Sequence, residues 1–391
     1  MNGIELLDIV NLGETSKVQF KETLPNAESM SRELAAMSNS GGGKILIGVK
    51  DKAGTVTGLT PEQIEYADRK MAEFADNLKP PIYLTTETVK VESDNSPKCV
   101  LVIYVDEGIN KPYKTAQGEI YVKQGSNKRL LTDNNEIMRL FQVSGNLCAD
   151  EMEVYGTSID DIDRQAFGEY FMNEFGETYE QKGLTFEKAL KAKRVLKNDR
   201  LTLAGLLFFG RTPQRIKPAF TIKVVSFFGN DISENQYRNK PEDLAGTIPD
   251  LFDDAMRYLK SSLFHLQAGQ NFNSIGILEI SEIALIELVQ NALIHRDYFK
   301  NAPVRILIFD NRVEIISPGK LPNSLTVEDI KYGNPVIRNN QLVAFCSHTL
   351  PFSGLGSGIK RAIKNQPNVE FINDVEGEQF KVIIPRPDKV K

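Results

Sequence analysis

The sequence predicts an α+β protein in which two α/β domains are joined by a middle region that is also α/β. Short apolar strands alternate with helical segments through residues 1–142. Near the other end, an amphipathic helix is followed by a hairpin and by two closing strands. Hydrophobic residues make up 41% of the 391 residues and charged residues 25%, a composition typical of a globular chain with roughly two or three domains.

Charge and cysteine content narrow the classes of function. The net charge is −5 and the pI is near 5.6. These values argue against a uniformly basic coat for nucleic acid but leave room for a local basic face. Three cysteines, far apart and without a CxxC pair, suggest neither a disulfide framework nor a zinc site, and predict a cytoplasmic protein. No stretch approaches the ~18 apolar residues of a membrane span, so no membrane partner is expected.

Residues 1–142 are expected to form the first domain. Gly41, Gly42 and Gly43 end a helix and precede KILIGV, which is typical of a buried strand. Alternating apolar and polar residues predict three further strands before a closing helix. In order, the expected elements are a strand at 14–21, a helix at 29–38, a strand at 44–51, a helix at 61–78, strands at 82–91, 98–107 and 119–126, and a helix at 134–141.

Three motifs of this domain are similar to those of a known family. They are Glu14 followed by VQFK, SNSGGGKILIGVKD with Gly58 after it, and YVKQGS near the end of the domain. Together they resemble the Schlafen AlbA-type domain, which occurs in many bacterial DNA-binding proteins and transcriptional regulators. The resemblance implies binding of DNA or RNA through phosphate contacts, which depend on charge and not on base identity. For any single lysine, the alternative is a solvated surface position. The side chains expected to make phosphate contacts are Lys17, Lys21, Lys44, Lys50, Lys123, Lys128 and Arg129.

A second interpretation of the same domain is a metal-dependent nuclease. Some Schlafen proteins place two acidic residues in an E…EFK motif and an aspartate after the glycine-rich strand, where carboxylates hold Mg²⁺ or Mn²⁺ and polarise a phosphate. Glu14 and Asp51 match two of these positions, whereas Gln19 stands at the third. The nearby Glu22 has the opposite parity to Gln19 on an extended strand. Because a neutral amide is a weaker ligand than a carboxylate, nuclease activity is the less favoured prediction.

Residues 143–157 are expected to be a linker, and residues 158–276 a connecting scaffold. Segments 160–175 and 184–196 have helical periodicity, whereas LTLAGLLFF at 201–209 is interpreted as an apolar strand before a Gly-Arg-Thr-Pro turn. A long helix is expected at 241–267, because Phe252, Met256, Leu259 and Leu263 recur at helical spacing. The region carries no evident chemical motif, so its expected role is packing.

The stretch ELVQNALIHRDY at residues 287–298 reads as a helix with an unusual polar face. Apolar residues form one stripe, and Glu287, Asn291 and His295 recur at i, i+4 and i+8 on another. One explanation is a solvated polar face with a capping histidine. The other is a ligand site, and the motifs that follow the helix favour it.

A hairpin and a glycine-rich loop follow this helix. VRILIF and VEIIS flank a tight turn at Asp310 and Asn311, and PGKLP then breaks the second strand. Helical segments are expected around 326–332 and 336–346, and GLGSGI opens a helix at 360–365. Strands at 369–374 and 379–385 complete a domain expected to span residues 277–391.

This ordered set resembles the GHKL ATPase fold of gyrase, MutL and histidine kinases, which is an α/β sandwich, and more closely its divergent RecG-like C-terminal form. The resemblance implies ATP and Mg²⁺ as cofactors. Asn291 would ligate Mg²⁺, and Glu287, one turn earlier, would orient or deprotonate an attacking water. Glycine-rich backbone at a helix N-terminus would bring N–H groups to the phosphates. The residues assigned to that loop are Gly354, Gly356, Ser357 and Gly358.

The resemblance also assigns residues elsewhere around the site. Gly319 would let the base lie close to the backbone, and His295, Arg296 and Asp297 would hold a lid or the phosphates. GHKL ATPases read adenine with an aspartate at the position that Ser317 occupies here. A hydroxyl accepts a weaker hydrogen bond than a carboxylate, by about 1 kcal/mol or more, so altered base preference is expected.

The combined prediction is a DNA-binding transcriptional regulator. Its GHKL-like domain would sense nucleotide or drive formation of a homodimer, with weak ATPase activity as a further option. The alternatives are a Schlafen-like nuclease acting on RNA or single-stranded DNA, and an inert interaction scaffold.

Overall fold

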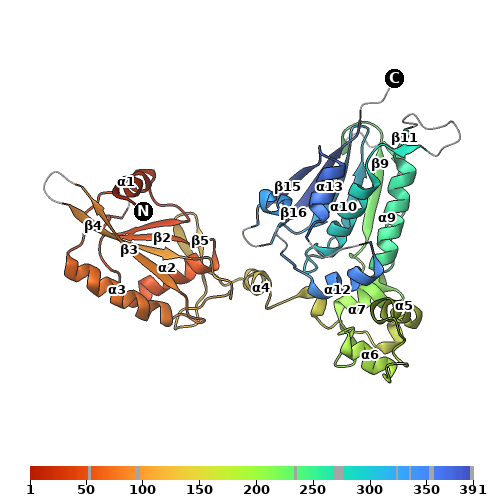
Figure 1. The fold of residues 1–391 in the computed structure, drawn as a ribbon, viewed down its shortest axis with the longest axis horizontal. Helices are drawn as coiled ribbons and strands as arrows, with labels where there is room; N and C mark the ends of the chain where they lie inside the picture. The colour runs from red at the N-terminus through yellow and green to blue at the C-terminus, as the bar shows by residue number, and fades with distance from the viewer. Residues whose placement is uncertain are drawn as a thin grey trace. The chain divides into compact units, whose positions relative to one another are not determined.

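The computed structural model describes residues 1–51, 54–92, 97–232, 236–266, 276–322, 325–333, 336–351 and 356–387. The chain divides into two compact units, Met1–Leu147 and Cys148–Lys391. Both contain sheets with helices packed on them, so the protein is α+β as the sequence predicts (Figure 1). Within the described residues, no helix is both long and apolar enough to cross a membrane.

The first unit is built on a four-stranded sheet in the order β1-β2-β4-β3. Its strands are β1 (Val18–Lys21), β2 (Gly43–Ile47), β3 (Leu84–Val91) and β4 (Lys98–Val105). β1 and β2 are parallel, and the other pairs are antiparallel. Successive strand residues face opposite sides, so each side of the sheet has its own core. Ile45 packs with residues of α2 (Ala27–Asn39) and α3 (Pro61–Asp76), while Leu46 packs with α1 (Gly3–Leu12).

The glycine triplet lies where backbones approach most closely. A Cβ on Gly42 would be 2.6 Å from the carbonyl oxygen of Val105, and one on Gly43 would be 2.5 Å from that of Lys17. These glycines are therefore required for packing between β1, β2 and β4. The unit ends with a hairpin of β5 (Tyr121–Gln124) and β6 (Asn127–Leu130), followed by α4 (Asn134–Val143).

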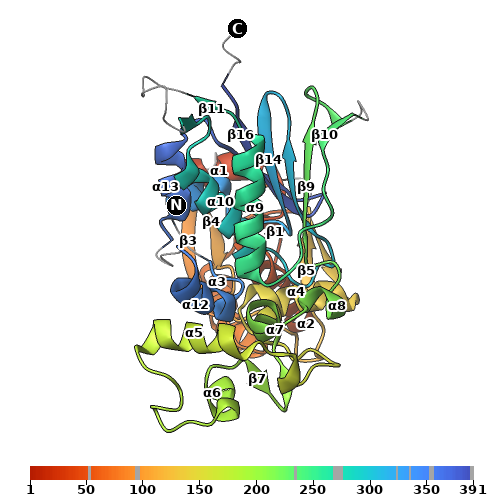
Figure 2. The same cartoon turned by 90° about the vertical axis from the view of Figure 1, so that its right-hand side faces the viewer.

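The second unit contains a six-stranded sheet in the order β10-β9-β13-β14-β16-β15. The strands are β9 (Ile222–Phe227), β10 (Tyr237–Asn239), β13 (Val304–Ile308), β14 (Arg312–Pro318), β15 (Glu370–Asp374) and β16 (Gln379–Pro385). The expected hairpin is β13 and β14, which pair antiparallel, whereas β9 and β13 are parallel. The helices α9 (Ile248–Ser262), α10 (Glu282–Ile294) and α13 (Gly358–Asn365) cover one face (Figures 1 and 2).

A helical layer lies at one end of this sheet (Figure 2). It contains α5 (Arg164–Phe175), α6 (Phe186–Ala192), α7 (Leu203–Phe209) and α12 (Asn340–Thr349). The unit also includes α8 (Pro213–Ile216), α11 (Val327–Lys331), the short pairs β7 (Leu196–Lys197) with β8 (Arg200–Leu201) and β11 (His265–Leu266) with β12 (Ile277–Leu278), and the 3-10 turns η1 (Ala149–Glu151) and η2 (Ile159–Asp161).

Two sequence predictions in this unit are wrong. The segment 201–209 is not a strand, because α7 begins after Thr202, whose hydroxyl accepts a hydrogen bond from the N–H of Gly205 at 3.1 Å. All seven residues of α7 are buried, so no polar face reveals the helical period. The helix expected at 241–267 is shorter, because Thr247 and Asp250 form a capping box that starts α9 at Ile248.

The middle region and the C-terminal region share one core. β9 pairs with β13, and a single cluster of buried side chains extends from Ala149 to Ile384. Residues expected to form a separate scaffold therefore supply two strands, β9 and β10, to the sheet that carries the candidate site, and the helix α9 that packs on it. The compact unit begins at Cys148, inside the expected linker.

Candidate functional site

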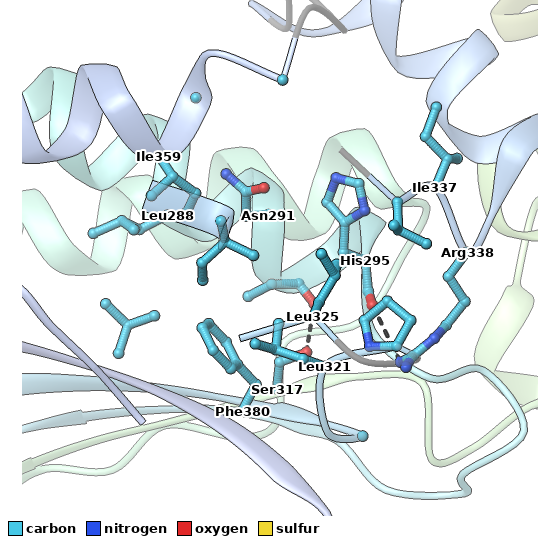
Figure 3. A pocket seen from close by; sticks show the side chains of 18 of the residues that line it. Leu288, Asn291, His295, Ser317, Leu321, Leu325, Ile337, Arg338, Ile359 and Phe380 are labelled. Atoms are coloured by element: carbon cyan, nitrogen blue, oxygen red, sulfur yellow. Dashed lines mark hydrogen bonds between the residues drawn. The ribbon is translucent and has the colours of Figure 1, made fainter. Parts of the chain in front are cut away.

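α10 brings the three polar residues of its stripe to a pocket. The hydroxyl of Ser281 caps the helix, accepting from the N–H of Ala284 at 3.5 Å. Glu287, Asn291 and His295 all line the pocket, and Figure 3 shows the last two pointing into it. Because Glu287 is 3% exposed, the stripe is not a solvated polar face.

The pocket is largely apolar between two polar ends. Its walls come from α10, β14, the turn after β14, the segment before α12, the start of α13, and β16 (Figure 3). Apolar lining is the expected environment for a flat ring system, with a few polar groups to orient it. The aliphatic and aromatic lining residues are Leu288, Ala292, Ile315, Leu321, Pro322, Leu325, Ile330, Val336, Ile337, Val343, Ile359, Phe380 and Val382.

Ser317 and Gly319 form one polar end. The hydroxyl of Ser317 donates to the carbonyl oxygen of Ala292 at 3.1 Å, so its oxygen is left to accept from a ligand. Gly319 has φ +98°, and a Cβ there would be 2.4 Å from the Cβ of Asp297 and 2.9 Å from Nη1 of Arg338. The turn after β14 therefore requires glycine at this position.

His295 and Asp297 lie beside this end but differ in role. Burial and then the charge of Arg338 lower the pKa of His295 to about 4, so the imidazole is neutral near pH 7. Asp297 is not among the lining residues. Its N–H donates to the carbonyl oxygen of Pro318 at 2.8 Å, and its carboxylate accepts from the N–H of Phe299 at 3.0 Å. Asp297 thus supports the turn that contains Gly319.

Glu287, Asn291 and Gly358 form the other polar end. Nδ2 of Asn291 donates to the carbonyl oxygen of Glu287 at 2.7 Å, which leaves the amide oxygen as the atom able to meet a cation. A Cβ on Gly358 would be 2.6 Å from Oε2 of Glu287 and 3.2 Å from Nδ2 of Asn291. The N-terminus of α13 therefore lies directly against both side chains. Gly356 also lines the pocket, Ser357 is the N-cap residue of α13, and Gly354 lies outside the described residues.

Only one of the two carboxylate oxygens of Glu287 has a charged partner. Oε1 is 2.6 Å from Nη2 of Arg361, whereas Oε2 is buried and has no hydrogen-bond partner in the described part of the chain. Burial raises the pKa of Glu287, and the charge of Arg361 opposes that rise. A buried carboxylate oxygen without a partner beside a glycine at a helix N-terminus fits Mg²⁺ and phosphate. Asn291 and Glu287 would hold the metal ion, which would neutralise phosphate charge.

Sequence reasoning missed three residues of this site. Arg361 lies one turn into the helix that GLGSGI opens, a position that its spacing from the glycines could have indicated. Arg338 lines the pocket, and its Nη2 donates to the carbonyl oxygen of Lys320 at 2.8 Å. Buried Asn339 donates from Nδ2 to the carbonyl oxygens of Ile294 at 2.8 Å and Arg296 at 2.9 Å. It thereby connects the pocket wall before α12 to the end of α10. No local sequence motif indicates this contact.

The seven basic residues expected to contact nucleic acid differ in position, exposure and partners within the first unit. Lys17 and Lys44 lie beside the glycine triplet, where the N–H of Lys44 bonds the carbonyl oxygen of Lys17 at 2.7 Å. Lys21 lies at the opposite end of these parallel strands and pairs with Asp51 at 2.8 Å, and Lys50 is nearby in sequence and exposed. The other three, Lys123, Lys128 and Arg129, come from the β5–β6 hairpin.

The hairpin cations already have carboxylate partners. Lys123 is 1% exposed, and its ammonium contacts Oε1 of Glu33 at 2.8 Å and Oε1 of Gln19 at 2.9 Å. Lys128 pairs with the other oxygen of Glu33 at 3.0 Å, and Arg129 pairs with Glu136 at 2.8 Å. The Lys123 ammonium is thus enclosed and does not face a phosphate.

The residues considered for a nuclease site do not gather their carboxylates at one point. Glu14 accepts hydrogen bonds from the side chain of Gln19 and, at 2.9 Å, from the N–H of Phe20, whereas Asp51 is paired with Lys21. Across the described segments, no group of three or more His, Cys, Asp or Glu side chains is placed to hold a metal ion. The ammonium of Lys123, not a further carboxylate, is the partner of the Gln19 amide oxygen.

Comparison with known proteins gives two family matches. Residues 14–132 match the Schlafen AlbA_2 family, and residues 301–384 match the family of the RecG ATP-dependent DNA helicase C-terminal region. The second match begins after α10, so the roles considered for Glu287 and Asn291 depend on the geometry of the pocket. No curated protein matches the chain. Among solved structures, the DIP2311 protein from Corynebacterium diphtheriae is 19% identical with a TM-score of 0.46, over 98% of this chain and 80% of that one.

Proposed function

We propose that this chain, which carries a Schlafen AlbA_2 domain and a RecG C-terminal-like domain, is a DNA-binding transcriptional regulator that binds a purine nucleotide with Mg²⁺. The observation that carries the nucleotide half is the pocket lined by Glu287, Asn291, Ser317 and Gly358. It combines an apolar slot with a polar group at one end and a helix N-terminus at the other.

The polar ends suit the two ends of a nucleotide. An exocyclic amine of a purine can donate to the oxygen of Ser317, whose own proton is given to Ala292. Phosphates can accept from backbone N–H groups at the start of α13, where Gly358 leaves room beside Glu287 and Asn291. Neutral His295 adds a polar group to the pocket lining without a charge near pH 7.

The nucleic-acid half is supported by the AlbA_2 match and by exposed cations of the first unit. Lys17 and Lys50 are exposed, and Lys44 lies beside Lys17. Phosphate contacts by such groups release counterions, so binding must weaken as salt rises. Because net charge is −5, we propose a small local contact surface in place of a uniformly basic one.

The test combines two titrations of the full chain. Labelled duplex DNA is titrated at several salt concentrations, with and without ATP and Mg²⁺, and thermal unfolding is measured with millimolar ATP, ADP, GTP or no nucleotide. We expect salt-dependent DNA binding and a higher melting temperature with ATP. Salt-independent or absent DNA binding rejects the first half, and an unchanged melting temperature rejects the second.

Two variants separate the pocket from general stability. Asn291→Ala is expected to abolish the increase in melting temperature with ATP and Mg²⁺, because it removes the amide oxygen at the phosphate end. Asn173→Ala, on the exposed face of α5, is the matched control and is expected to keep that increase. Sedimentation of the same samples tests the expected homodimer and whether nucleotide changes its population.

A further inference from the structure

Arg361 and Glu287 form an unequal ion pair beside the phosphate end of the pocket. Oε1 of Glu287 and Nη2 of Arg361 are 2.6 Å apart, and the arginine side chain is 42% exposed whereas the glutamate side chain is 3% exposed. The pair joins α10 to α13, the two helices between which the phosphates would lie. One partner is therefore buried beside the pocket, and the other is partly exposed to solvent.

The exposed partner is the one able to change its contact. A guanidinium presents five N–H donors in a planar fork that suits phosphate as well as carboxylate. Arg361 is the fourth residue of the helix that begins at Gly358, so it lies in the first turn beside that N-terminus. Glu287 cannot follow it outward, because the carboxylate is packed against Gly358.

We propose that Arg361 is a specificity-determining residue that reads the terminal phosphate of a nucleoside triphosphate. In the absence of nucleotide it contacts Glu287, and with a triphosphate bound it contacts the terminal phosphate. This inference rests on the nucleotide site proposed above. It adds that the site distinguishes nucleotides by the number of their phosphates, and that Glu287 gives up its arginine partner only when the third phosphate is present.

A purely structural ion pair predicts a different result. If Arg361 only neutralises Glu287, its removal lowers the melting temperature and weakens all nucleotides equally. If Arg361 reads the terminal phosphate, its removal weakens ATP more than ADP or AMP. The ratio of the dissociation constants for ADP and ATP is therefore the informative quantity, because a general loss of stability cancels from it.

The experiment measures binding of ATP, ADP and AMP with Mg²⁺ by calorimetry to the full-length wild-type chain and to Arg361→Ala, Arg361→Lys and Lys364→Ala. Lys364 is exposed on the same helix. Lys364→Ala removes one positive charge, as Arg361→Ala does, and is therefore the matched control. Arg361→Ala is expected to weaken ATP roughly tenfold and ADP less than twofold, consistent with loss of one charge-assisted hydrogen bond. Arg361→Lys is expected to restore part of the ratio, because it keeps the charge without the fork.

Glu287→Gln provides the reciprocal test. Loss of the metal-holding carboxylate is expected to weaken ATP and ADP alike. Because Arg361 also loses the partner that competes with phosphate, the ADP-to-ATP ratio of dissociation constants is expected to rise several-fold. In the double variant with Arg361→Ala this rise in the ratio is expected to disappear, which a double-mutant cycle measures. Wild-type protein that binds no nucleotide rejects the proposed site. Wild-type protein that binds nucleotide, with an ADP-to-ATP ratio unchanged by Arg361→Ala, rejects only the role of Arg361.

Discussion

The buried charges of the two units are satisfied in different ways. In the first unit, the ammonium of Lys123 contacts Glu33, Gln19 and the carbonyl oxygen of Ser126, all within 2.9 Å. In the second unit, Oε2 of Glu287 is buried without a partner among the residues described, and a glycine lies where a side chain would cover it. Because orphaned buried polar atoms are costly, a closed network stabilises a fold, whereas an open one beside a pocket can be satisfied by a ligand.

The comparison therefore separates residues of the same chemical type by how far other groups of the protein already satisfy their charge. Lys123 and Lys17 are both lysines of one domain, but the first is enclosed and the second is exposed. Glu33 and Glu287 are both buried carboxylates, but the first has two lysine partners and the second has one arginine on one oxygen. The predictions below test this separation in order of expected effect.

The largest effect is expected from Lys123→Met. Removing the ammonium leaves Glu33 and Gln19 without their central partner, and breaking a buried ion pair typically costs about 3–5 kcal/mol. Because Lys128 still contacts Glu33 at 3.0 Å, we expect the lower end of that range. Denaturant unfolding of the full chain measures it, and Lys17→Met is the exposed control with an expected change below about 0.5 kcal/mol. Equal stability of the two variants would contradict the closed network.

The next effect is a dependence of stability on pH in the second unit. Asp150 accepts from the N–H groups of Gln341 at 2.7 Å and Leu342 at 3.1 Å, at the start of α12. Burial raises its pKa to about 6, although these N–H groups oppose the rise. The folded chain then holds a proton that the unfolded chain has lost, so this contribution is complete below about pH 4 and disappears by about pH 6.

The pKa shift of His295 has the opposite effect on the pH dependence of stability. Its pKa is lowered to about 4, so as pH falls below about 6.5 the unfolded chain takes up a proton first and the folded state loses stability. Each shift corresponds to about 3 kcal/mol, and the two nearly cancel between pH 4 and 6.5. Asp150→Asn removes only the first contribution, so stability of this variant should rise by about 3 kcal/mol over that range. Urea denaturation from pH 4 to 7 measures the profile, and a variant parallel to wild type contradicts the assignment.

Local patterns made much of the C-terminal fold predictable. The stripe of α10, the β13–β14 hairpin and the helix after GLGSGI depend on residues close in sequence, and each lies where the pattern indicated. The seven buried residues of α7 were misread because periodicity needs a contrast between faces, which a fully buried helix lacks.

Pairings between distant residues could not be predicted in this way. Lys123 contacts Glu33, which lies 90 positions earlier, and Asn339 contacts Ile294, which lies 45 positions earlier. Only the folded chain therefore shows that this lysine is enclosed and that this asparagine connects two walls of the pocket. The same limit applies to Arg361, whose partner lies on another helix. Chemical type was therefore predictable at these positions, and availability for a ligand was not.

A smaller effect is expected when the open end of the pocket is filled. In Gly358→Ala the added Cβ would lie 2.6 Å from Oε2 of Glu287. We expect roughly tenfold weaker ATP binding with a change in unfolding free energy below about 1 kcal/mol, because the clash involves the end of a side chain and alanine favours the helix. Gly168→Ala in α5, where an added Cβ meets nothing within 4 Å, is the control that should leave binding unchanged. Unaltered ATP binding by Gly358→Ala would place the phosphates elsewhere.

The smallest effects are expected from single substitutions of exposed lysines. They test whether DNA contacts specific lysines of the first unit or responds to any exposed positive charge. Lys17→Gln and Lys50→Gln should each weaken DNA binding several-fold and reduce the slope of log K against log salt by about 1, because each removes one phosphate contact. Lys90→Gln, exposed on the edge strand β3, should change neither quantity. Binding measured at four salt concentrations distinguishes these cases. If Lys90→Gln reduces the slope as much as Lys17→Gln, the lysines act only through net charge, and the exposed cations of the first unit do not form a defined interface.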